Sequence, residues 1–580
     1  MAYVLASLLW IILLYGHAIV GGFSSYDDVP QIAQNPALSS SSGALKYFRT
    51  SVSFSSDLHG SGESFYRPIF WLSLAMDKKL WGLNPVAFHL TNLLLHWMSG
   101  LFLFLLLRRL QISSLSSAFT SLLWLSLPIN CEAVAWISGR PYCLAACFLL
   151  LGMLLADQYL SRPRVKYLVG FCLAAGCALL SHEEGVLIVA LTLLLIIAKH
   201  QVKSRAAIML NSVSVVTTLL YFWLRHAASA TVVAAKGTVV PFGLFFWKYL
   251  GWMVLPVNMS MERSTDTPPA GWSGHALAAW LCLALAFSGV LVMRRKNPRL
   301  LIGFAWIVIG LLPFCGIVPI YQGMAERYTY FASAGLALTV VLIAEESRGR
   351  WRPLIYGLLA TWLLWGVYRL ETRISDWSDA AQLYAHSLQA DPRSPKLHYN
   401  LGAVLEERRE FAQARPEYKS AIDLQPNYEP AIAGLGNVYL NLGSADEASK
   451  MFEKALELKP DDVKTVTNYG TALQSLGEID AAKTQYQRAI SLAPDNDDAY
   501  CDLGALYFRA GDMRDAVLEF NLAAKTNPED PVPLFNLAGI FRKIGRPDLA
   551  IKLYEQALQL NPGDPDTISA LQSLLHTPAE

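Results

Sequence analysis

The stretch LGNVYLNLGSADEASKMFEKALELKP, residues 435–460, specifies the architecture of the carboxyl-terminal part of this chain. Its last residue belongs to a series of prolines in which each member follows the previous one by 34 residues: Pro392, Pro426, Pro460, Pro494, Pro528 and Pro562. A constant spacing of this length indicates an internal repeat. Units of this size cannot bury an apolar face alone, so they stack on one another.

Small residues and aromatic rings recur with the same period. The small positions are Gly402, Gly436, Gly470, Gly504 and Ala538, then Ala414, Ala448, Ala482, Ala516 and Ala550, and the rings are Tyr418, Phe452, Tyr486, Phe520 and Tyr554. Small residues let the two helices of a unit approach, rings fill the gap between units, and proline closes each second helix. The period and pattern are those of the tetratricopeptide repeat, and five full repeats are expected over 395–562.

The flanks of the repeats continue the pattern in part. Ala380, Tyr384 and Pro392 are in phase, which predicts a half repeat with a helix over 376–389. We expect a linker and half repeat over 371–394, with Glu371 to Ser375 as the linker, and a capping helix and tail over 563–580. Five polar residues of the concave surface are candidates to hydrogen-bond an extended acceptor peptide: Asn400, Asn437, Asn441, Asn468 and Asp502.

The rest of the chain has a different composition. The 580 residues are 53% hydrophobic and 16% charged, with a formal net charge of +1. Residues 1–370 hold 27 basic and 14 acidic residues, whereas residues 371–580 hold 20 and 32. The first part has too few charges to cover a water-facing surface, which excludes a single soluble enzyme. Seven of the eight cysteines lie there and are interpreted as small buried hydrophobic residues, not as metal ligands or a disulfide framework.

Apolar segments recur throughout residues 1–370 and predict a polytopic membrane helix bundle. They lie near 3–22, 66–80, 86–107, 115–129, 141–160, 167–181, 185–198, 206–224, 275–293, 300–320, 327–344 and 353–370. The first is expected to be a retained helix. Clusters of Arg and Lys mark the inner side, which puts 23–65, 182–185, 225–273 and 321–326 outside. One of the three segments between 65 and 140 then cannot span, so about eleven crossings are expected.

Ionisable residues gather on the predicted outer face. They include Asp27, Asp28, Arg67, Glu132, Arg140, His182, Glu183, Glu326 and Arg327. Ionisable groups near hydrocarbon are costly and usually have a role. Arginine presents a planar fork to phosphate oxygens, and a carboxylate can accept a hydroxyl proton. The set therefore suits a site that binds a lipid-linked phosphate and activates a hydroxyl, although structural ion pairs at helix ends have the same pattern.

These residues stand in motifs that carry a resemblance over essentially the whole chain. The motifs are Asp27-Asp28 with Ile32 and Asn35, Tyr66-Arg67-Pro68, Phe88-His89-Leu90, Glu132-Ala133-Val134 with Gly139-Arg140, Ser181-His182-Glu183-Glu184-Gly185, and Glu326-Arg327 with Tyr330. Together they resemble the transmembrane and tetratricopeptide repeat-containing O-mannosyltransferases. The resemblance implies a GT-C type glycosyltransferase that moves a sugar, with mannose favoured, from a polyprenyl or dolichyl phosphate carrier to an acceptor hydroxyl on the outer or lumenal side.

The resemblance also implies residue roles. Asp27 or Asp28 is expected to be the catalytic base, and Arg67, Arg140 or Arg327 is expected to bind the carrier phosphate. Tyr66, His89, Glu132, His182, Glu183 and Glu326 are expected to support them at the outer face. The sequence departs from the family where Tyr142 replaces an acid and where His182 replaces a lysine. These departures leave the sugar and the acceptor open; no cofactor is implied with certainty, and a divalent metal stays possible.

Alternatives to protein O-glycosylation stay open at the level of sequence. A membrane scaffold without catalysis would use the repeats to assemble partners, and a ligase of lipid-linked oligosaccharides would transfer a whole glycan. The expected partners are the carrier-linked sugar, a protein or peptide acceptor and membrane lipid, with no nucleic acid. A bacterial inner membrane with periplasmic repeats is favoured, and an endoplasmic reticulum membrane with lumenal repeats is the expectation for a eukaryote.

Overall fold

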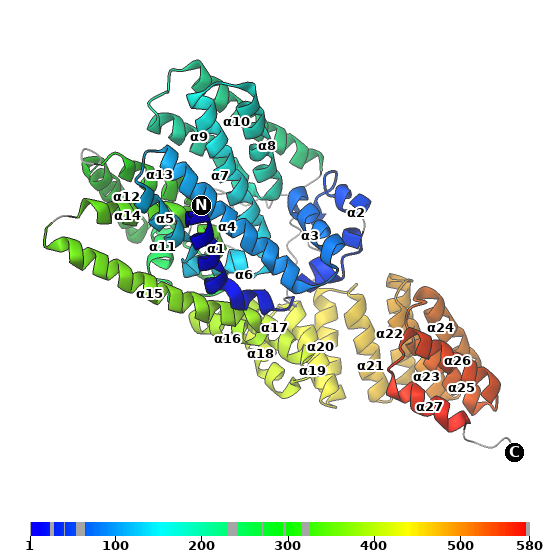
Figure 1. The fold of residues 1–580 in the computed structure, drawn as a ribbon. Helices are drawn as coiled ribbons and strands as arrows, with labels where there is room; N and C mark the ends of the chain where they lie inside the picture. The colour runs from blue at the N-terminus through cyan, green and yellow to red at the C-terminus, as the bar shows by residue number, and fades with distance from the viewer. Residues whose placement is uncertain are drawn as a thin grey trace. The chain divides into compact units, whose positions relative to one another are not determined.

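The computed structural model describes residues 2–23, 28–39, 41–53, 64–228, 240–269, 271–293, 297–315, 324–347 and 349–575. The chain forms two compact units, Met1–Leu397 and His398–Glu580. In Figure 1 the first runs from blue to yellow-green and the second from yellow to red. The predicted all-α class is confirmed, since the described strands are one antiparallel pair, β1 (Val52–Ser53) and β2 (Ser64–Phe65).

The first unit is built from α-helices with short 3-10 or π turns between them. Its α-helices are α1 (Ala2–Tyr15), α2 (Ser41–Lys46), α3 (Pro68–Trp81), α4 (Pro85–Arg109), α5 (Ser114–Leu125), α6 (Cys131–Ala135), α7 (Arg140–Ser161), α8 (Val165–Ser181), α9 (Leu187–Ala198), α10 (Arg205–Ala227), α11 (Phe242–Val254), α12 (Gly274–Met293), α13 (Arg299–Leu311), α14 (Ala332–Glu346), α15 (Trp351–Ser378) and α16 (Ala380–Ala390). The short turns are η1 (Gly16–Val20), η2 (Val29–Ala33), η3 (Pro36–Ser39), η4 (Pro128–Asn130), η5 (Ile137–Gly139), η6 (Glu183–Val186), η7 (Ser264–Asp266), η8 (Leu312–Phe314) and η9 (Glu326–Thr329).

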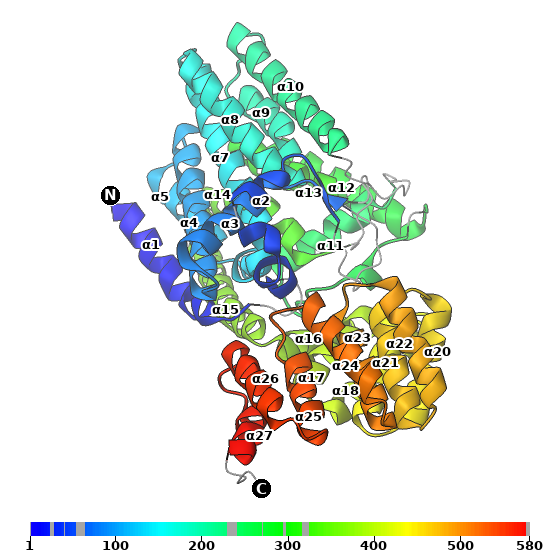
Figure 2. The same ribbon diagram turned by 90° about the vertical axis from the view of Figure 1, so that its right-hand side faces the viewer.

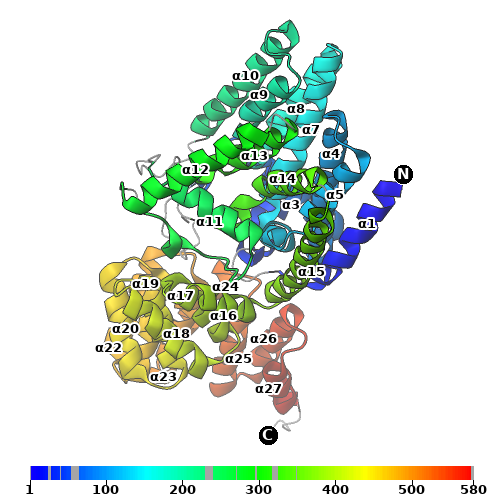
Figure 3. The same cartoon turned by 90° about the vertical axis from the view of Figure 1, so that its left-hand side faces the viewer.

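Several helices of this unit have the length and composition of membrane spans. Four described helical stretches qualify, at Pro85–Arg109, Ile137–Ser161, Arg205–Ala227 and Gly274–Val292, and the bent pair Ser114–Leu125 and Pro128–Ala135 makes a fifth. Figure 2 shows α7, α8, α9 and α10 as neighbours, and Figure 3 shows α13 beside α14. The chain is therefore a membrane protein, and the number of eleven crossings stays a prediction.

Helix α3 is the best candidate for the apolar segment that does not cross. It has 14 residues and is about 21 Å long. Arg67, at its N-cap, pairs with Glu183, which the sequence places outside. Near its other end, the Lys78 ammonium donates to the Ile32 carbonyl oxygen at 3.1 Å, in the first predicted outer loop. Because both ends contact segments predicted to be outside, the contacts favour a place for α3 along the predicted outer face.

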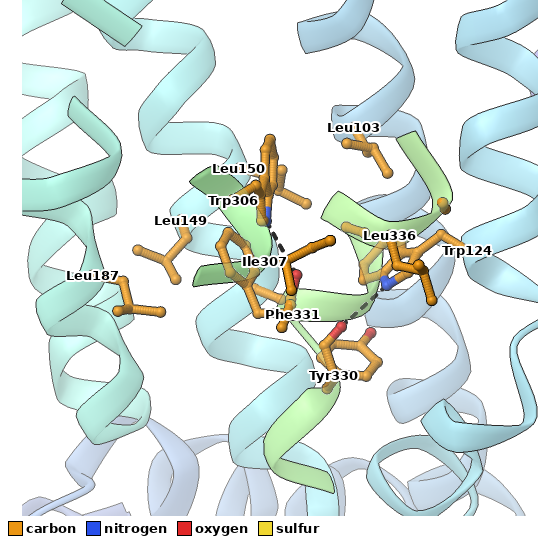
Figure 4. Packing of buried hydrophobic residues seen from close by; sticks show 14 of the residues in the cluster. Leu103, Trp124, Leu149, Leu150, Leu187, Trp306, Ile307, Tyr330, Phe331 and Leu336 are labelled. Carbon is orange, nitrogen blue, oxygen red and sulfur yellow. Dashed lines mark hydrogen bonds between the residues drawn. The ribbon is translucent and has the colours of Figure 1, made fainter. Parts of the chain in front are cut away.

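The core of the bundle fixes the segment that follows η9. The Trp124 indole donates to the Tyr330 carbonyl oxygen at 3.1 Å, and the Trp306 indole donates to the Phe331 carbonyl oxygen at 3.1 Å (Figure 4). Both indoles are almost fully buried. An indole N–H inside an apolar core needs a partner, and here the partners are the backbone carbonyls of the two residues before α14. The packing therefore holds η9 at the end of the bundle.

The predicted linker over Glu371 to Ser375 is wrong, because α15 continues without a break to Ser378. Arg373 and Ile374 are 1% and 2% exposed, so packing keeps this stretch helical. The half repeat is present as α16, whose start is capped by Asp379 through a bond from the Gln382 N–H. The first unit extends through it to Leu397, so the membrane part and the half repeat form one body.

The second unit is the repeat solenoid. Its helices, beginning with one that starts at the end of the first unit, are α17 (Pro395–Glu407), α18 (Phe411–Leu424), α19 (Glu429–Asn441), α20 (Ala445–Leu458), α21 (Val463–Ser475), α22 (Ile479–Leu492), α23 (Asp497–Ala510), α24 (Met513–Thr526), α25 (Val532–Lys543), α26 (Pro547–Leu560) and α27 (Pro565–Leu575). The small residues act as expected: a Cβ built on Gly436 would stand 2.6 Å from the Phe452 ring, and one on Gly470 2.7 Å from the Tyr486 ring. Helix α27 lies in the predicted capping region.

Candidate active site

The acidic pair of the first loop is described in part. Asp27 lies outside the described residues. Asp28 is 1% exposed, and its Oδ1 accepts hydrogen bonds from the Ser138 N–H at 3.0 Å and the Ser138 hydroxyl at 2.5 Å. Asp28 therefore ties the first loop to η5, directly before α7.

Arg140, at the start of α7, is surrounded by acceptors. Its guanidinium lies 2.7 Å from the Asp77 carboxylate, donates to the Asn92 side-chain oxygen at 2.7 Å, and donates to the Phe88 carbonyl oxygen at 3.0 Å. The Arg140 side chain is fully buried. With its donors used in this way, the arginine holds α3, α4 and α7 together, and the geometry favours a structural role over a phosphate ligand.

Arg67 meets the loop between α8 and α9. It donates through Nε to Glu183 Oε2 at 2.9 Å and through a terminal nitrogen to the same atom at 2.7 Å. Burial opposes ionisation of Glu183, but the charges of Arg67 and its neighbours lower its pKa to about 2. The Arg67 side chain is 17% exposed, so the pair sits at the rim of the bundle.

His182 and Glu184 flank that pair, and burial shifts the pKa of each in the direction that favours its neutral form. Burial, with the charge of Arg67, lowers the pKa of His182 to about 3. His182 Nδ1 accepts from the Glu184 N–H at 3.2 Å, so Nε2 carries the proton and faces Glu183 Oε2 at 3.6 Å. Burial and the charge of Glu183 raise the pKa of Glu184 well above its ordinary value.

Arg327 forms the second ion pair of the site. Its guanidinium pairs with Glu132, and its backbone N–H donates to Glu132 Oε2 at 3.0 Å. The guanidinium also lies 5.6 Å from the Trp136 ring centroid. These contacts join η9 to α6.

Tyr142 lies between the two arginine pairs. Its ring centroid is 4.2 Å from that of His182 and 6.3 Å from that of Tyr328, the neighbour of Arg327. The phenol interacts electrostatically with both Arg67 and Arg327. The residue that replaces an acid of the family thus occupies the centre of the charged cluster.

Glu326 points away from Arg327 into a separate cluster. It accepts from the Ser260 N–H at 2.6 Å and from Arg263 at 2.9 Å, and Arg373 lies 3.7 Å away. The loop that holds Ser260 and Arg263 also contacts the half repeat, because the Met261 N–H donates to the Ser387 hydroxyl at 3.3 Å. Glu326 therefore connects η9 with α15, and the segment that holds Ser260 and Met261 connects it with α16.

Two further predicted residues are buried near these groups. The Tyr66 hydroxyl donates to the Phe48 carbonyl oxygen at 3.0 Å, which links α3 to the first loop. His89 is 7% exposed, and within the described residues neither ring nitrogen has a hydrogen-bond partner. A Cβ on Gly21 would stand 3.4 Å from His89 Nε2, so the imidazole faces the segment that leads to the acidic pair.

The residues of the repeats that are predicted to bind the acceptor differ in their exposure and in their hydrogen-bond partners. The Asn468 amide donates to the Asn437 side-chain oxygen at 2.7 Å, which joins the first helices of two neighbouring units. Asn441 is exposed, whereas Asn400 is only 5% exposed and is left out of the candidate surface. Burial, with the charge of Asp498, raises the pKa of Asp502 to about 6.

Within the described residues, no three His, Cys, Asp or Glu side chains are grouped to hold a metal ion. Sequence reasoning missed Tyr221 and Arg225, which lie at the predicted outer end of α10 and interact electrostatically with Glu183. The available signal was Arg225 itself, because a basic residue at an outer helix end departs from the positive-inside pattern.

Comparison with known families identifies the repeats. Models described as tetratricopeptide repeat match residues 369–429, 406–468 and 531–564, and one described as TPR repeat matches 470–511. Among solved structures, that of YrrB, a TPR protein with an unusual peptide-binding site, is 22% identical and covers 33% of this chain and all of its own, with a TM-score of 0.27.

Curated relatives match both parts of the chain. The protein O-mannosyl-transferase F38B6.6 of Caenorhabditis elegans is 24% identical over 432 residues, which cover 71% of this chain and 61% of the relative. The protein O-mannosyl-transferase TMTC3 of Homo sapiens is 24% identical over 493 residues, covering 75% and 53%. TMTC2 of Mus musculus is 23% identical, covering 64% and 56%. The chain thus spans between about half and three fifths of the length of these relatives.

Proposed function

We propose that this chain, a homologue of the TMTC protein O-mannosyl-transferases that carries tetratricopeptide repeats, is a membrane glycosyltransferase. It transfers a sugar, with mannose favoured, from a polyprenyl or dolichyl phosphate carrier to a hydroxyl group of a protein acceptor. The observation that carries the proposal is the cluster in which Tyr142 interacts electrostatically with both Arg67 and Arg327. Two arginines at the end of a helix bundle suit a lipid-linked phosphate.

Asp27 is the proposed base. Asp28 already accepts two hydrogen bonds from Ser138, which supports a structural role for it and leaves its neighbour for the chemistry. In the transfer, the acceptor oxygen forms a bond to C1 of the sugar while the bond between C1 and the phosphate oxygen breaks. The hydroxyl proton passes to the Asp27 carboxylate, and the carrier leaves as the polyprenyl phosphate.

Arg67 and Arg327 are proposed to bind the carrier phosphate, and the repeats are proposed to recruit the acceptor. Arg140 is left out, because Asp77, Asn92 and Phe88 already use its donors. The topology that supports this arrangement has eleven crossings, with α3 on the outer face. The favoured location is a bacterial inner membrane with periplasmic repeats, or the endoplasmic reticulum membrane with lumenal repeats in a eukaryote.

The test compares Asp27→Asn with Asp28→Asn in purified protein supplied with polyprenyl phosphate mannose and acceptor protein. Asp27→Asn is expected to abolish transfer and keep the thermal stability of the parent, whereas Asp28→Asn is expected to lower stability. Unchanged turnover in Asp27→Asn would remove the base assignment. An acceptor mass shift larger than one hexose would indicate an oligosaccharide ligase.

A membrane scaffold without catalysis is the second candidate. The observation in its favour is that Arg67 and Arg327 each already have a carboxylate partner. It predicts partner binding by the repeats with no sugar transfer from any carrier, so the same assay separates the two functions.

A further inference from the structure

Five buried polar atoms that lack partners among the described residues belong to residues around the ion pair of Arg67 and Glu183. Within the described residues, hydrogen bonds are lacking at Glu183 Oε1, both Glu184 carboxyl oxygens, the Tyr221 hydroxyl and Arg225 Nε. Native proteins leave few buried polar atoms unsatisfied, because each one loses its bonds to water. A concentration of them indicates a place where bound water or a ligand completes the hydrogen bonds.

These atoms come from two elements that are linked through Glu183, with which Tyr221 and Arg225 both interact electrostatically. Glu183 and Glu184 lie on η6, and Tyr221 and Arg225 lie on the last turns of α10. The Tyr221 and Tyr66 ring centroids are 6.2 Å apart, and both rings pack with Leu179. Tyr221 also interacts electrostatically with Glu183 and Arg67, and the Arg225 side chain lies beside its hydroxyl. The unsatisfied atoms are thus next to one of the two arginines proposed to bind the phosphate.

The chemistry of the set distinguishes between possible ligands. Glu184 is 1% exposed, and burial beside Glu183 raises its pKa well above the ordinary value; its protonated form offers one donor and one acceptor. The Tyr221 hydroxyl, 2% exposed, also donates and accepts, and Arg225 Nε donates. A phosphate cannot donate to the carboxylate oxygen of Glu183 and would be repelled by it. A sugar hydroxyl both donates and accepts, so it matches every atom of the set.

We propose that Glu184, Tyr221 and Arg225 form the subsite that binds the hydroxyl groups of the carrier-linked sugar. Arg67 pairs with Glu183 beside this subsite and is placed to contact the phosphate of the same carrier, and Glu184 also interacts electrostatically with Tyr142. The inference rests on the proposed function, because it assigns the donor's sugar ring to a site beside the proposed phosphate ligands.

The experiment measures selectivity with the full chain in lipid nanodiscs. Transfer is followed from polyprenyl phosphate mannose and from carriers whose mannose lacks the hydroxyl at position 2, 3, 4 or 6. The parent protein is expected to disfavour at least one analogue by about 10-fold to 100-fold in kcat/KM, because a buried site loses a hydrogen bond to the missing hydroxyl. Tyr221→Phe, which removes one oxygen, is expected to lower kcat/KM for mannose about 10-fold and to abolish selectivity at one position only.

Glu184→Gln is the second variant, and it is expected to alter selectivity at another position or at the same one. Tyr15→Phe is the matched control, because Tyr15 is also a buried tyrosine whose hydroxyl lacks a partner, and its electrostatic partners are Cys131 and Cys143. The control is expected to retain every selectivity ratio of the parent. Binding of polyprenyl phosphate without sugar is expected to be the same in Tyr221→Phe and the parent.

With a parent protein that transfers mannose, three outcomes overturn the subsite. The first is an equal loss of kcat/KM for mannose and all analogues in Tyr221→Phe and Glu184→Gln, which would indicate a structural role. The second is weakened binding of the sugar-free carrier, which would indicate a phosphate site. The third is that the ratios of kcat/KM between mannose and its analogues are unchanged in both variants while the parent transfers mannose. This third outcome removes the subsite and leaves the proposed function intact. If the parent transfers no sugar, the proposed function fails. Native mass spectrometry then measures how tightly the protein binds mannose and deoxymannose carriers, and the ratios of these affinities test the subsite. A protein that binds none of the carriers overturns both the subsite and the proposed function.

Discussion

Replacing Arg140 separates a structural arginine from a phosphate ligand. The guanidinium and the Asp77 carboxylate are 0% and 8% exposed and 2.7 Å apart. Arg140→Met leaves a buried carboxylate whose remaining described partner is the Thr91 hydroxyl at 3.0 Å. Breaking a buried pair by removing one partner costs about 3–5 kcal/mol. We therefore expect a large loss of stability in Arg140→Met and little change in the donor KM of the fraction that stays folded.

The magnitude is tested by a double-mutant cycle with Asp77→Asn. Asp77→Asn alone leaves a buried guanidinium and is expected to be as damaging as Arg140→Met. The double variant removes both charges, so it should be less destabilised than the sum of the single variants, with a coupling free energy of about 2–3 kcal/mol. Unfolding free energies are measured in detergent by chemical denaturation, and donor kinetics are measured on the same samples.

The reasoning fails if the two substitutions are additive, or if Arg140→Met keeps the parent stability and raises the donor KM at least 10-fold. Either result would return Arg140 to the phosphate site that its motif implies. Arg108→Met is the control for loss of a positive charge, because the Arg108 side chain donates to the Ile112 carbonyl oxygen at the predicted inner face. It is expected to leave the donor KM unchanged.

Three further predictions concern the repeats. Gly436→Ala is expected to lower the unfolding free energy of its unit by about 1–3 kcal/mol, because the new Cβ would stand 2.6 Å from the Phe452 ring. The loss is measured by denaturing the full chain and following hydrogen exchange in α19. Protection of α19 equal to that of the parent would contradict this prediction. Arg409 has a φ of 60° where the later units have glycine, a backbone conformation that costs free energy for a residue with a Cβ. Arg409→Gly is therefore expected to stabilise α17 and α18 by about 1 kcal/mol in the same assay. A loss of hydrogen-exchange protection in these helices would refute this prediction. The pKa of Asp502 is raised in the folded state to about 6 from 3.8, so its stabilising effect is complete below pH 3.8 and is lost as the pH rises through 6. The amides of α23 should therefore exchange faster at about pH 7 than at about pH 5, after correction for intrinsic exchange. Asp502→Asn should remove that difference.

The sequence predicted the repeat unit well because the repeat is a local pattern. Its period, its small residues and its rings are fixed within 34 residues, and the closest contacts join helices that are neighbours along the chain. The continuation of α15 through residues 371–375 was missed for the opposite reason. Residues 371–375 have no helical pattern strong enough to exclude a linker, and they stay helical because Arg373 and Ile374 are buried against distant segments.

The candidate site was predicted only as a set of residue types on one face. Charge pattern and motif named Arg67, Glu183, Glu132 and Arg327, and the structure brings them together around Tyr142. The same reasoning ranked Arg140 with the other arginines. The difference between them is the carboxylate of Asp77, which α3 supplies from 63 residues away in the chain.

By itself, the sequence determined that an apolar, positively charged membrane part precedes an acidic helical solenoid, because composition and periodicity are local properties of the chain. Only the tertiary structure decided which charged groups pair with each other and which buried polar atoms are left without partners. Pairing depends on distances between residues far apart in sequence, and at these distances a change of a few ångströms decides whether an arginine is a structural anchor or is placed to bind a ligand.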